Sequence, residues 1–485
     1  MDFSDSTSCT GPTPVVSPDG RCVAFMQEYR LTVRDVETQE LVQVFSCAES
    51  VESLAWSPTG EHILCVLSGR ALVQVFSIAD LLWSCTINEG AAGVLRALWS
   101  GTGRHVVVVP DFCIRLSVWN LSDDSVQTLP GPKFYDRGID LHPDGTHLAV
   151  LGRASCKDSL AVYQCSDWRQ TVHVSLSTHD ATEASWSPSG DSIALCDGPA
   201  HGYRFYVVAA DGSPLASYLP PVAGLGVRHL SWSPSGQLLA VGTHEDGLDI
   251  LDHVTWTPLV TLAHPLNVTE PRDLVAYVEE EEGASGGLRS LKASAGSEEA
   301  LGGPVPETAR PLAGGSRSPS KLPLPGSPSK LASLSGGPET LPSAAPVPRA
   351  TRSRFALATL PLRLPAPPKG GAAGVAQALW STSGSFVAAR CEEAPSAVWI
   401  WSVATLRLQA LLVLVRPVKT VSWEPGADRL AVCTGTGKLF LWTPEGASCA
   451  HVPFAGFRAQ SAAWNPKGGS LVLAAKNAFC CAYVA

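Results

Sequence analysis

The sequence predicts an all-β fold, a β-propeller with about nine blade-like units and one long insertion. The first observation is a recurring apolar residue, usually Trp, followed by Ser-Pro-x-Gly, whose successive copies start 40, 43, 42, 45, 46, 148, 43 and 41 residues apart. A period of about 40–45 residues is typical of four-stranded propeller blades. The second observation is that short, β-branched-rich runs bounded by turn residues lie between the copies, which favours strands over helices.

The repeat places seven tryptophans in one register, which we interpret as structural residues of the blades. They are Trp56, Trp99, Trp186, Trp232, Trp380, Trp423 and Trp464. Val16 and Leu141 occupy the same register in the two remaining units. In each clear copy Pro and Gly predict a tight turn, so the Ser-Pro pairs at Ser57, Ser187 and Ser233 are interpreted as structural.

The third predicted strand of several units carries a WD-like ending, as in Val118–Leu121, Ile400–Val403 and Leu441–Pro444. No copy reads Trp-Asp, so the repeats are of a degenerate WD type held together mainly by packing. One ring of eight or nine blades is favoured, and seven blades with two extra units is the alternative. The chain ends just after a third strand, and the residues before Val15 are the natural donors of the missing fourth.

The sequence divides into N-terminal blades (1–270), an insertion (271–372) and C-terminal blades (373–485). From Gly283 to Gly370 the chain is dominated by Gly, Pro, Ser and Ala, with Phe355 as its one aromatic residue. Such a composition predicts disorder. The segment follows an acidic run, Glu279–Glu282, and residues 305–370 hold nine Lys or Arg and two Glu, a net charge of +7.

The insertion contains two candidate phosphorylation sites. Ser318 and Ser327 are each followed by Pro-Ser-Lys, which matches a proline-directed kinase pattern. A phosphate at either site would add about −1.5 to −2 charges to a basic stretch.

Composition disfavours several other classes of protein. The net charge of −9, without a basic stripe interleaved with aromatic residues, argues against nucleic-acid binding. The polar N-terminus and the lack of an apolar run of roughly 20 residues predict neither a secretory signal nor membrane insertion. The fourteen cysteines include no C-x-x-C pair and are expected to be reduced, buried side chains of an intracellular protein.

No residue set points to catalysis, a cofactor or a metal. Cys433–Lys438 superficially resembles a phosphate-binding loop, but the first Gly is replaced by Val432 and no helix follows, so a hairpin turn is expected. The twelve histidines are scattered without ligand spacing. A non-catalytic interaction scaffold is therefore predicted; clustered carboxylates or histidines in the central channel would revive an enzyme.

Beyond the repeat, several segments resemble the centrosomal WD repeat-containing protein 8 family. They are Tyr29–Val36, Leu72–Ser77, Ile87–Gly93, Cys165–Trp168, Asp252–Trp256 and Ala397–Trp401. The resemblance runs from the first blade to the last, outside the insertion, which is longer and richer in Pro, Gly and Ser than the family's pattern.

The resemblance implies a protein of the cytoplasm and cytoskeleton, at the centrosome, centriolar satellites and spindle pole. It implies a complex with a coiled-coil partner, the synovial sarcoma X breakpoint-interacting protein or its fungal counterpart, and in fungi a minus-end-directed kinesin. The implied roles are microtubule minus-end anchoring, spindle organisation and cilium assembly, with no catalytic residues. The alternative is a general WD-repeat adaptor, such as a ubiquitin-ligase substrate receptor.

Overall fold

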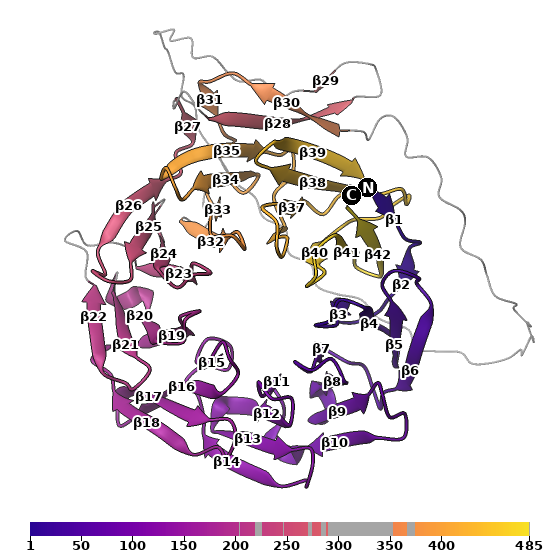
Figure 1. Ribbon diagram of the computed structural model, residues 1–485, viewed down its shortest axis with the longest axis vertical. Coiled ribbons are helices and arrows are strands. Elements are labelled where there is room, and N and C mark those ends of the chain that lie inside the picture. Colours follow the sequence, from indigo (N-terminus) through magenta and orange to yellow (C-terminus); the bar gives the residue numbers. More distant parts are fainter. Residues whose placement is uncertain are drawn as a thin grey trace, which may run out of the picture.

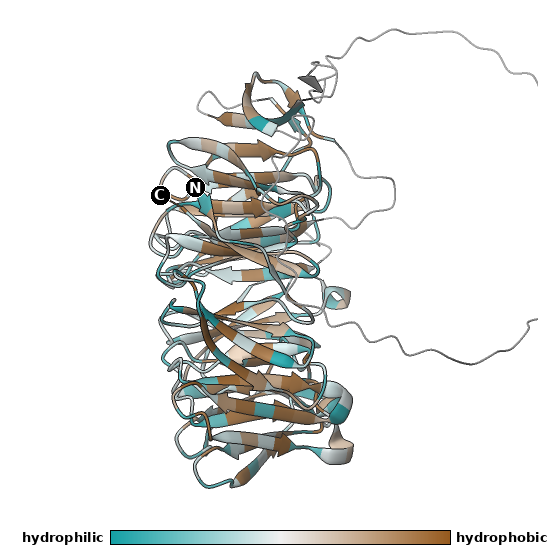
Figure 2. Ribbon diagram, turned by 90° about the vertical axis from the view of Figure 1, so that its right-hand side faces the viewer, coloured by the Kyte–Doolittle hydropathy of each residue, from teal (hydrophilic) through white to brown (hydrophobic). Residues whose placement is uncertain are grey.

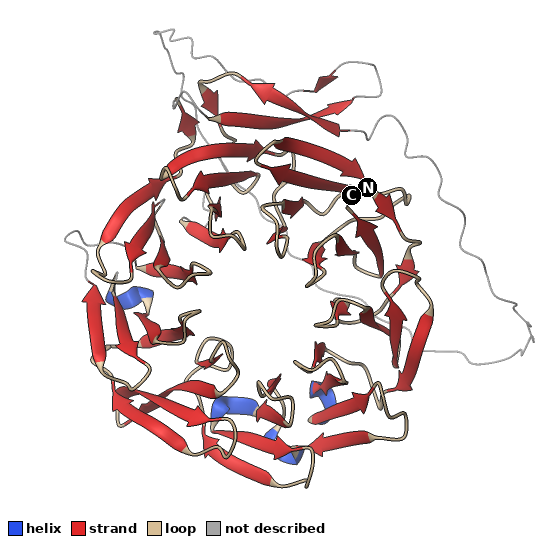
Figure 3. Ribbon diagram, in the orientation of Figure 1, coloured by secondary structure: helices blue, strands red, loops and turns tan. Residues whose placement is uncertain are grey.

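Nine sheets arranged as blades form one closed ring in the computed structural model of the chain (Figure 1). The structure describes residues 1–202, 204–218, 226–245, 247–269, 274–282, 288–289, 353–365 and 374–484. Strands make up nearly all of the regular structure, and helix is confined to four short 3-10 turns in the described residues (Figure 3). These are η1 (Ser68–Arg70), η2 (Gly90–Ala92), η3 (Asp111–Cys113) and η4 (Pro199–His201).

Blades 1 to 5 follow one another along the chain, each an antiparallel sheet of four strands. Their strands are β3 (Val15–Val16), β4 (Cys22–Gln27), β5 (Arg30–Asp35) and β6 (Leu41–Ser46); β7 (Ser53–Trp56), β8 (His62–Leu67), β9 (Leu72–Ser77) and β10 (Ser84–Asn88); β11 (Arg96–Trp99), β12 (His105–Val109), β13 (Arg115–Asn120) and β14 (Val126–Pro130); β15 (Ile139–Leu141), β16 (His147–Ala154), β17 (Lys157–Gln164) and β18 (Gln170–Ser175); and β19 (Ala181–Trp186), β20 (Ser192–Asp197), β21 (Phe205–Ala209) and β22 (Pro214–Tyr218).

Blades 6 to 9 complete the ring on either side of the insertion. Their strands are β23 (Val227–Trp232), β24 (Leu238–Thr243), β25 (Gly247–Asp252) and β26 (Pro258–Ala263); β32 (Val375–Trp380), β33 (Phe386–Cys391), β34 (Ala397–Ser402) and β35 (Arg407–Val413); β36 (Thr420–Trp423), β37 (Leu430–Cys433), β38 (Lys438–Thr443) and β39 (Gly446–His451); and β40 (Ser461–Trp464), β41 (Ser470–Ala474) and β42 (Ala478–Tyr483). The structure therefore has nine blades in one ring, the larger of the two counts favoured for a single ring, and rejects the seven-bladed alternative.

The core of the molecule lies between blades. Nine hydrophobic clusters of buried residues each join one blade to the next around the ring. Alternate residues of a strand point to opposite sheet faces, so each central strand contributes to two clusters and carries apolar residues on both faces. In blade 2, for example, Leu64 packs toward blade 3 and Cys65 toward blade 1. Apolar residues recur along the strands of the ring (Figure 2).

The N-terminal residues close the ring. Strands β1 (Asp2–Phe3) and β2 (Thr7–Ser8) pair antiparallel with β42, the third strand of blade 9. Phe25 of blade 1 packs against Phe479 of blade 9 with ring centroids 4.7 Å apart. This is the closure that the missing fourth strand predicted, and it explains why both termini lie together in Figure 1.

Additional strands cover the outer edge of blade 7. Strand β28 (Val275–Glu282) runs parallel to β35, and β30 (Ser353–Ala358) pairs antiparallel with β28. Three short strands accompany them: β29 (Leu288–Arg289) beside β28, and β27 (Asn267–Val268) paired with β31 (Leu362–Arg363). Predicted disorder over 271–372 therefore does not hold at its two ends, because β35 offers an unpaired edge and Tyr277 and Phe355 pack together with ring centroids 5.9 Å apart.

Candidate functional site

The signature tryptophans link neighbouring blades through their indole N–H groups. Five of them donate to a backbone carbonyl of the preceding blade's innermost strand at 3.0–3.1 Å. The pairs are Trp56 with Val15, Trp99 with Ala55, Trp380 with Ser231, Trp423 with Leu379 and Trp464 with Ser422. In each pair the acceptor is the residue directly before the signature position of the preceding blade. The bond of Trp380 joins two blades that are separated in sequence by the insertion.

Trp186 and Trp232 keep this position but not this bond. Among the described residues their buried indole nitrogens have no hydrogen-bond acceptor. Trp186 instead packs edge-on against His142, with ring centroids 4.8 Å apart, and Trp232 packs against Trp256 at 6.0 Å. The seven tryptophans therefore share a place in the blade while five of them share the inter-blade bond.

The Ser-Pro-x-Gly turns are internally hydrogen-bonded. The hydroxyl oxygens of Ser57, Ser187 and Ser233 each accept a backbone N–H five residues further on, at 3.0, 3.2 and 3.0 Å. All three serines are buried. Their place in the turns accounts for these Ser-Pro pairs without modification. Ser318 and Ser327, the two candidate phosphosites, lie outside the described residues and remain a prediction.

The innermost strands of blades 4 to 6 carry ionisable side chains. Burial raises the pKa of Asp140 and of Glu183, and the charge of Arg137 opposes the rise at Glu183. Burial also lowers the pKa of His229, whose Nε2 lies 3.2 Å from the carbonyl of Ala378 in blade 7. Asp140 accepts the backbone N–H of Trp186 at 2.7 Å, so this carboxylate braces two blades.

Clustered carboxylates or histidines in the central channel would have favoured an enzyme. Among the described residues, these three side chains come closest to such a cluster. Within that part of the chain, no three His, Cys, Asp or Glu side chains are grouped so as to hold a metal ion. Asp140 and His229 each have an inter-blade hydrogen-bonding role.

Two buried ion-pair clusters were not foreseen from the sequence. Between blades 4 and 5, Lys133 contacts Asp158 at 3.0 Å and Asp180 at 2.6 Å. At the edge of blade 8, Lys438 contacts Glu279 at 2.8 Å and Glu281 at 2.7 Å. Burial opposes the charge of Lys438, but the hydrogen bonds that its ammonium group donates to the two glutamates outweigh burial and raise the pKa of Lys438.

Lys438 also shows why the phosphate-loop resemblance of Cys433–Lys438 was misleading. The segment joins β37 to β38 as a hairpin, as expected. The Lys438 side chain is 7% exposed, and its ammonium group is ion-paired with Glu279 and Glu281. No local sequence signal pairs it with an acidic run more than 150 residues away.

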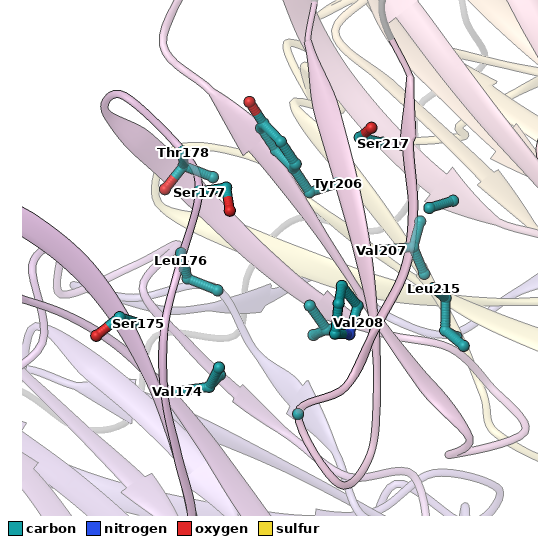
Figure 4. Close-up of a pocket in the computed structure, with 13 residues that line it drawn as sticks. Val174, Ser175, Leu176, Ser177, Thr178, Tyr206, Val207, Val208, Leu215 and Ser217 are labelled. Carbon is teal, nitrogen blue, oxygen red and sulfur yellow. The ribbon is translucent and has the colours of Figure 1, made fainter.

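A groove of about 380 Å³ opens between the outer strands of blades 4 and 5 (Figure 4). Val174 and Leu176 form one wall, and Val208 and Leu215 form the other. The only side-chain polar groups in the lining are hydroxyls, and no charged residue contributes. Its volume is within the usual range for small-ligand sites, but its chemistry suits only an apolar occupant.

The ring presents two distinct faces. The loop face carries the loops between second and third strands and the links from one blade to the next, such as 68–71, 110–114 and 198–202. The turn face carries the Ser-Pro-x-Gly turns and the third-to-fourth strand turns, such as 57–60 and 78–83. In Figure 2 the short helical turns project to the right, on the loop face, and both termini lie to the left.

In the part of the chain that the structure describes, no helix is long and apolar enough to cross a membrane.

Nine four-stranded units, signature tryptophans and Ser-Pro-x-Gly turns define a WD-repeat-type β-propeller. No model of a protein family matches the sequence. The chain is 33% identical over 486 residues to WD repeat-containing protein WRAP73 of Mus musculus, which covers 100% of this chain and 96% of that protein. The chain therefore belongs to the family of WD repeat-containing protein WRAP73, which confirms the family resemblance of its sequence.

One solved structure with a TM-score above 0.5 supports the fold. A eukaryotic initiation factor is 8% identical, with a TM-score of 0.53 over 93% of this chain and 90% of that chain. The C-terminal WD40 domain of Sif2 is 11% identical, with a TM-score of 0.48 over 100% and 99% of the two chains. At such identity the first likeness shows the propeller fold and nothing about function.

Proposed function

We propose that this chain is a non-catalytic scaffold of the centrosome and spindle pole that binds a coiled-coil partner. The observation that carries the proposal is the relationship to WRAP73 along the whole chain, together with the family resemblance of the blade sequences. Through that partner, and with a minus-end-directed kinesin in the complex, the scaffold would support microtubule minus-end anchoring, spindle organisation and cilium assembly.

The architecture suits a scaffold. Nine inter-blade clusters and the tryptophan bonds hold the loops of both faces on a rigid ring. Binding residues often lie on loops that a rigid framework positions. Asp140 and His229 on the innermost strands have inter-blade partners, so a structural role accounts for these two residues.

The test is affinity purification of the tagged full-length chain from dividing cells, followed by mass spectrometry. The proposal expects a coiled-coil centrosomal protein as the most enriched partner, recovered in stoichiometric amounts. Recovery of cullin-adaptor subunits as the dominant partners would contradict it and favour a ubiquitin-ligase receptor. The tag alone, purified from the same cells, is the control for non-specific recovery.

A further inference from the structure

Four large apolar side chains are exposed together on the loop face around blade 3. Phe112 is 89% exposed and Ile114 77%, and Leu95 and Tyr135 are 43% and 45% exposed. They come from three connections: the link into blade 3, the loop between β12 and β13, and the link into blade 4. Exposed apolar side chains gathered in this way typically mark an interaction site.

Contacts between these connections make the patch continuous and rigid. Arg96, next to Leu95, donates through Nη1 to the carbonyls of Tyr135 and Asp136 at 3.1 and 3.0 Å. The carboxylate of Asp111 lies against Gly93, at the position where a side chain would begin. Gly131 is closed in by the backbone of Cys113 and Ile114.

The backbone of the central loop is strained. Phe112 and Cys113 are consecutive non-glycine residues in the left-handed region, with φ of +64° and +52°. A bulky aromatic residue rarely adopts this conformation. In this conformation Phe112 is exposed, so its ring gains no burial in the core.

The rim of the patch is basic. Arg115, Arg137, Arg153 and Lys157 are exposed on the same loops and on the adjoining β16–β17 hairpin. Arg115 is paired with Glu89 at 3.2 Å and Arg153 with Asp180 at 2.5 Å, so the basic character of the rim rests on Arg137 and Lys157. The hairpin is joined to the link into blade 4 by hydrogen bonds between Lys133 and Leu151 and between Leu151 and Gly138. Over residues 89–96, 110–115, 131–138 and 151–158 the one exposed carboxylate is Asp136, since Asp111 is half-buried and Glu89 and Asp158 are buried.

We propose that this surface, the Phe112 ridge, docks into the groove between two packed helices of the partner, flanked there by acidic side chains. Phe112 and Ile114 are 89% and 77% exposed, so the partner must supply the groove that covers them. Arg137 and Lys157 select acidic flanks, because interface potentials are arranged to be complementary. This inference rests on the proposed function, since the paired helices are those of the coiled-coil partner.

Photocrosslinking in dividing cells locates the contact. Phe112 is replaced by the photoreactive amino acid p-benzoylphenylalanine in the full-length chain, and the crosslinked peptide is sequenced. The matched control carries the same residue at Leu82, which is 96% exposed on the turn face. We expect position 112 to crosslink to a helical heptad segment with net negative charge and position 82 not to do so. No crosslink at 112, equal crosslinking at 82, or a basic or non-helical target would overturn the inference.

Binding of the purified coiled-coil partner then tests the energetics. Because Asn tolerates the left-handed conformation, Phe112→Asn combined with Ile114→Asp should leave the fold intact. We expect at least about thirtyfold weaker binding, as for loss of a central interface residue. Leu82→Asp should bind like wild type. Arg137→Glu with Lys157→Glu should weaken binding more at low salt than at high salt.

The outcomes separate this inference from the proposed function. If a coiled-coil partner is recovered and the Phe112/Ile114 variant binds it like wild type, the ridge is not the docking surface, although the scaffold proposal stands. If no coiled-coil partner is recovered with the wild-type chain, the proposed function fails and this inference fails with it. An unfolding midpoint close to wild type for the variant shows that weaker binding is not caused by misfolding.

Discussion

The ammonium nitrogen of Lys438 lies 2.8 Å from a carboxylate oxygen of Glu279, which joins the third strand of blade 8 to a strand added at the edge of blade 7. Both side chains are buried, 7% and 2% exposed. The second oxygen of Glu279 accepts the backbone N–H of Val415 at 2.9 Å. The pair therefore fixes β28 to the ring across two blades.

Removing Lys438 should destabilise the protein strongly. Lys438→Met leaves Glu279 buried without its cation, and breaking one side of a buried pair costs about 3 kcal/mol or more. The measurement is the free energy of unfolding in urea. Arg354→Met is the matched control, because Arg354 and Glu280 form an exposed pair that should contribute less than about 1 kcal/mol. Equal effects of the two substitutions would contradict the assigned role of the buried pair.

Substituting the signature tryptophans should destabilise the protein to different degrees, depending on whether the indole N–H is hydrogen-bonded. Trp99→Phe removes an indole donor and leaves the carbonyl of Ala55 without it, so a loss of about 1 kcal/mol is expected beyond the change in packing. Trp232→Phe removes a buried N–H that has no acceptor among the described residues, so it should cost less or be neutral. Unfolding free energies of the two variants decide the matter. A greater loss for Trp232→Phe would argue against inter-blade bonding as the common function of this position.

Opening the ring should be costly. Deleting residues 1–13 removes β1 and β2 and leaves β42 as an exposed edge. We expect the unfolding midpoint to fall by at least about 5 °C. The hydrophobic cluster that joins blades 9 and 1 would lose Cys9 and the two strands that pair with β42. Differential scanning calorimetry of the truncated and full-length chains is the measurement. An unchanged midpoint would mean that the ring does not depend on this closure.

The insertion should divide into a dispensable and a required part. Its composition predicts that a short Gly/Ser linker in place of residues 290–350 leaves the unfolding midpoint within about 1 °C of wild type. Extending the replacement to 283–370 should lower the midpoint, because it deletes β30 and the packing of Phe355 between Tyr277 and Phe440. Loss of soluble protein with the shorter replacement would contradict the first expectation, and equal midpoints would contradict the second.

Asp158 should make stability depend on acid pH. Burial opposes its charge, but hydrogen bonds from the Ala181 N–H and from Lys133 outweigh burial and lower the pKa of this carboxyl. Its contribution is therefore complete above the unfolded-state pKa of about 3.9 and is lost as pH falls through the lower folded-state value. Asp158→Asn should lose about 3 kcal/mol at pH 7.

The pH series distinguishes this effect from simple loss of packing. The difference between wild type and Asp158→Asn should narrow between pH 4 and pH 2 in urea titrations. Asp191→Asn, in an exposed turn, should follow the wild-type curve throughout. A difference between wild type and Asp158→Asn that is independent of pH would show that the charge of Asp158 does not stabilise the fold.

Much of the ring could be predicted from sequence because its signals are local. Trp56 and the turn at Ser57 mark the same point in blade after blade, and short-range turn chemistry fixes the strands on either side. The edge strands β28 and β30 could not be predicted, because their burial depends on Lys438 and Phe440 from a distant blade. The exposure of Phe112 was equally hidden, since an isolated aromatic residue near a turn is normally read as part of the core.

The central claim, that this propeller is a scaffold of the spindle pole, is tested most directly by locating the chain in dividing cells. The measurement is the fluorescence of the tagged full-length chain at the poles relative to the cytoplasm, with the endogenous chain depleted. The account predicts concentration at both poles throughout mitosis, unchanged in Leu82→Asp and reduced in the Phe112→Asn/Ile114→Asp variant. Uniform cytoplasmic fluorescence of the wild-type chain, with normal spindles after its depletion, would contradict it.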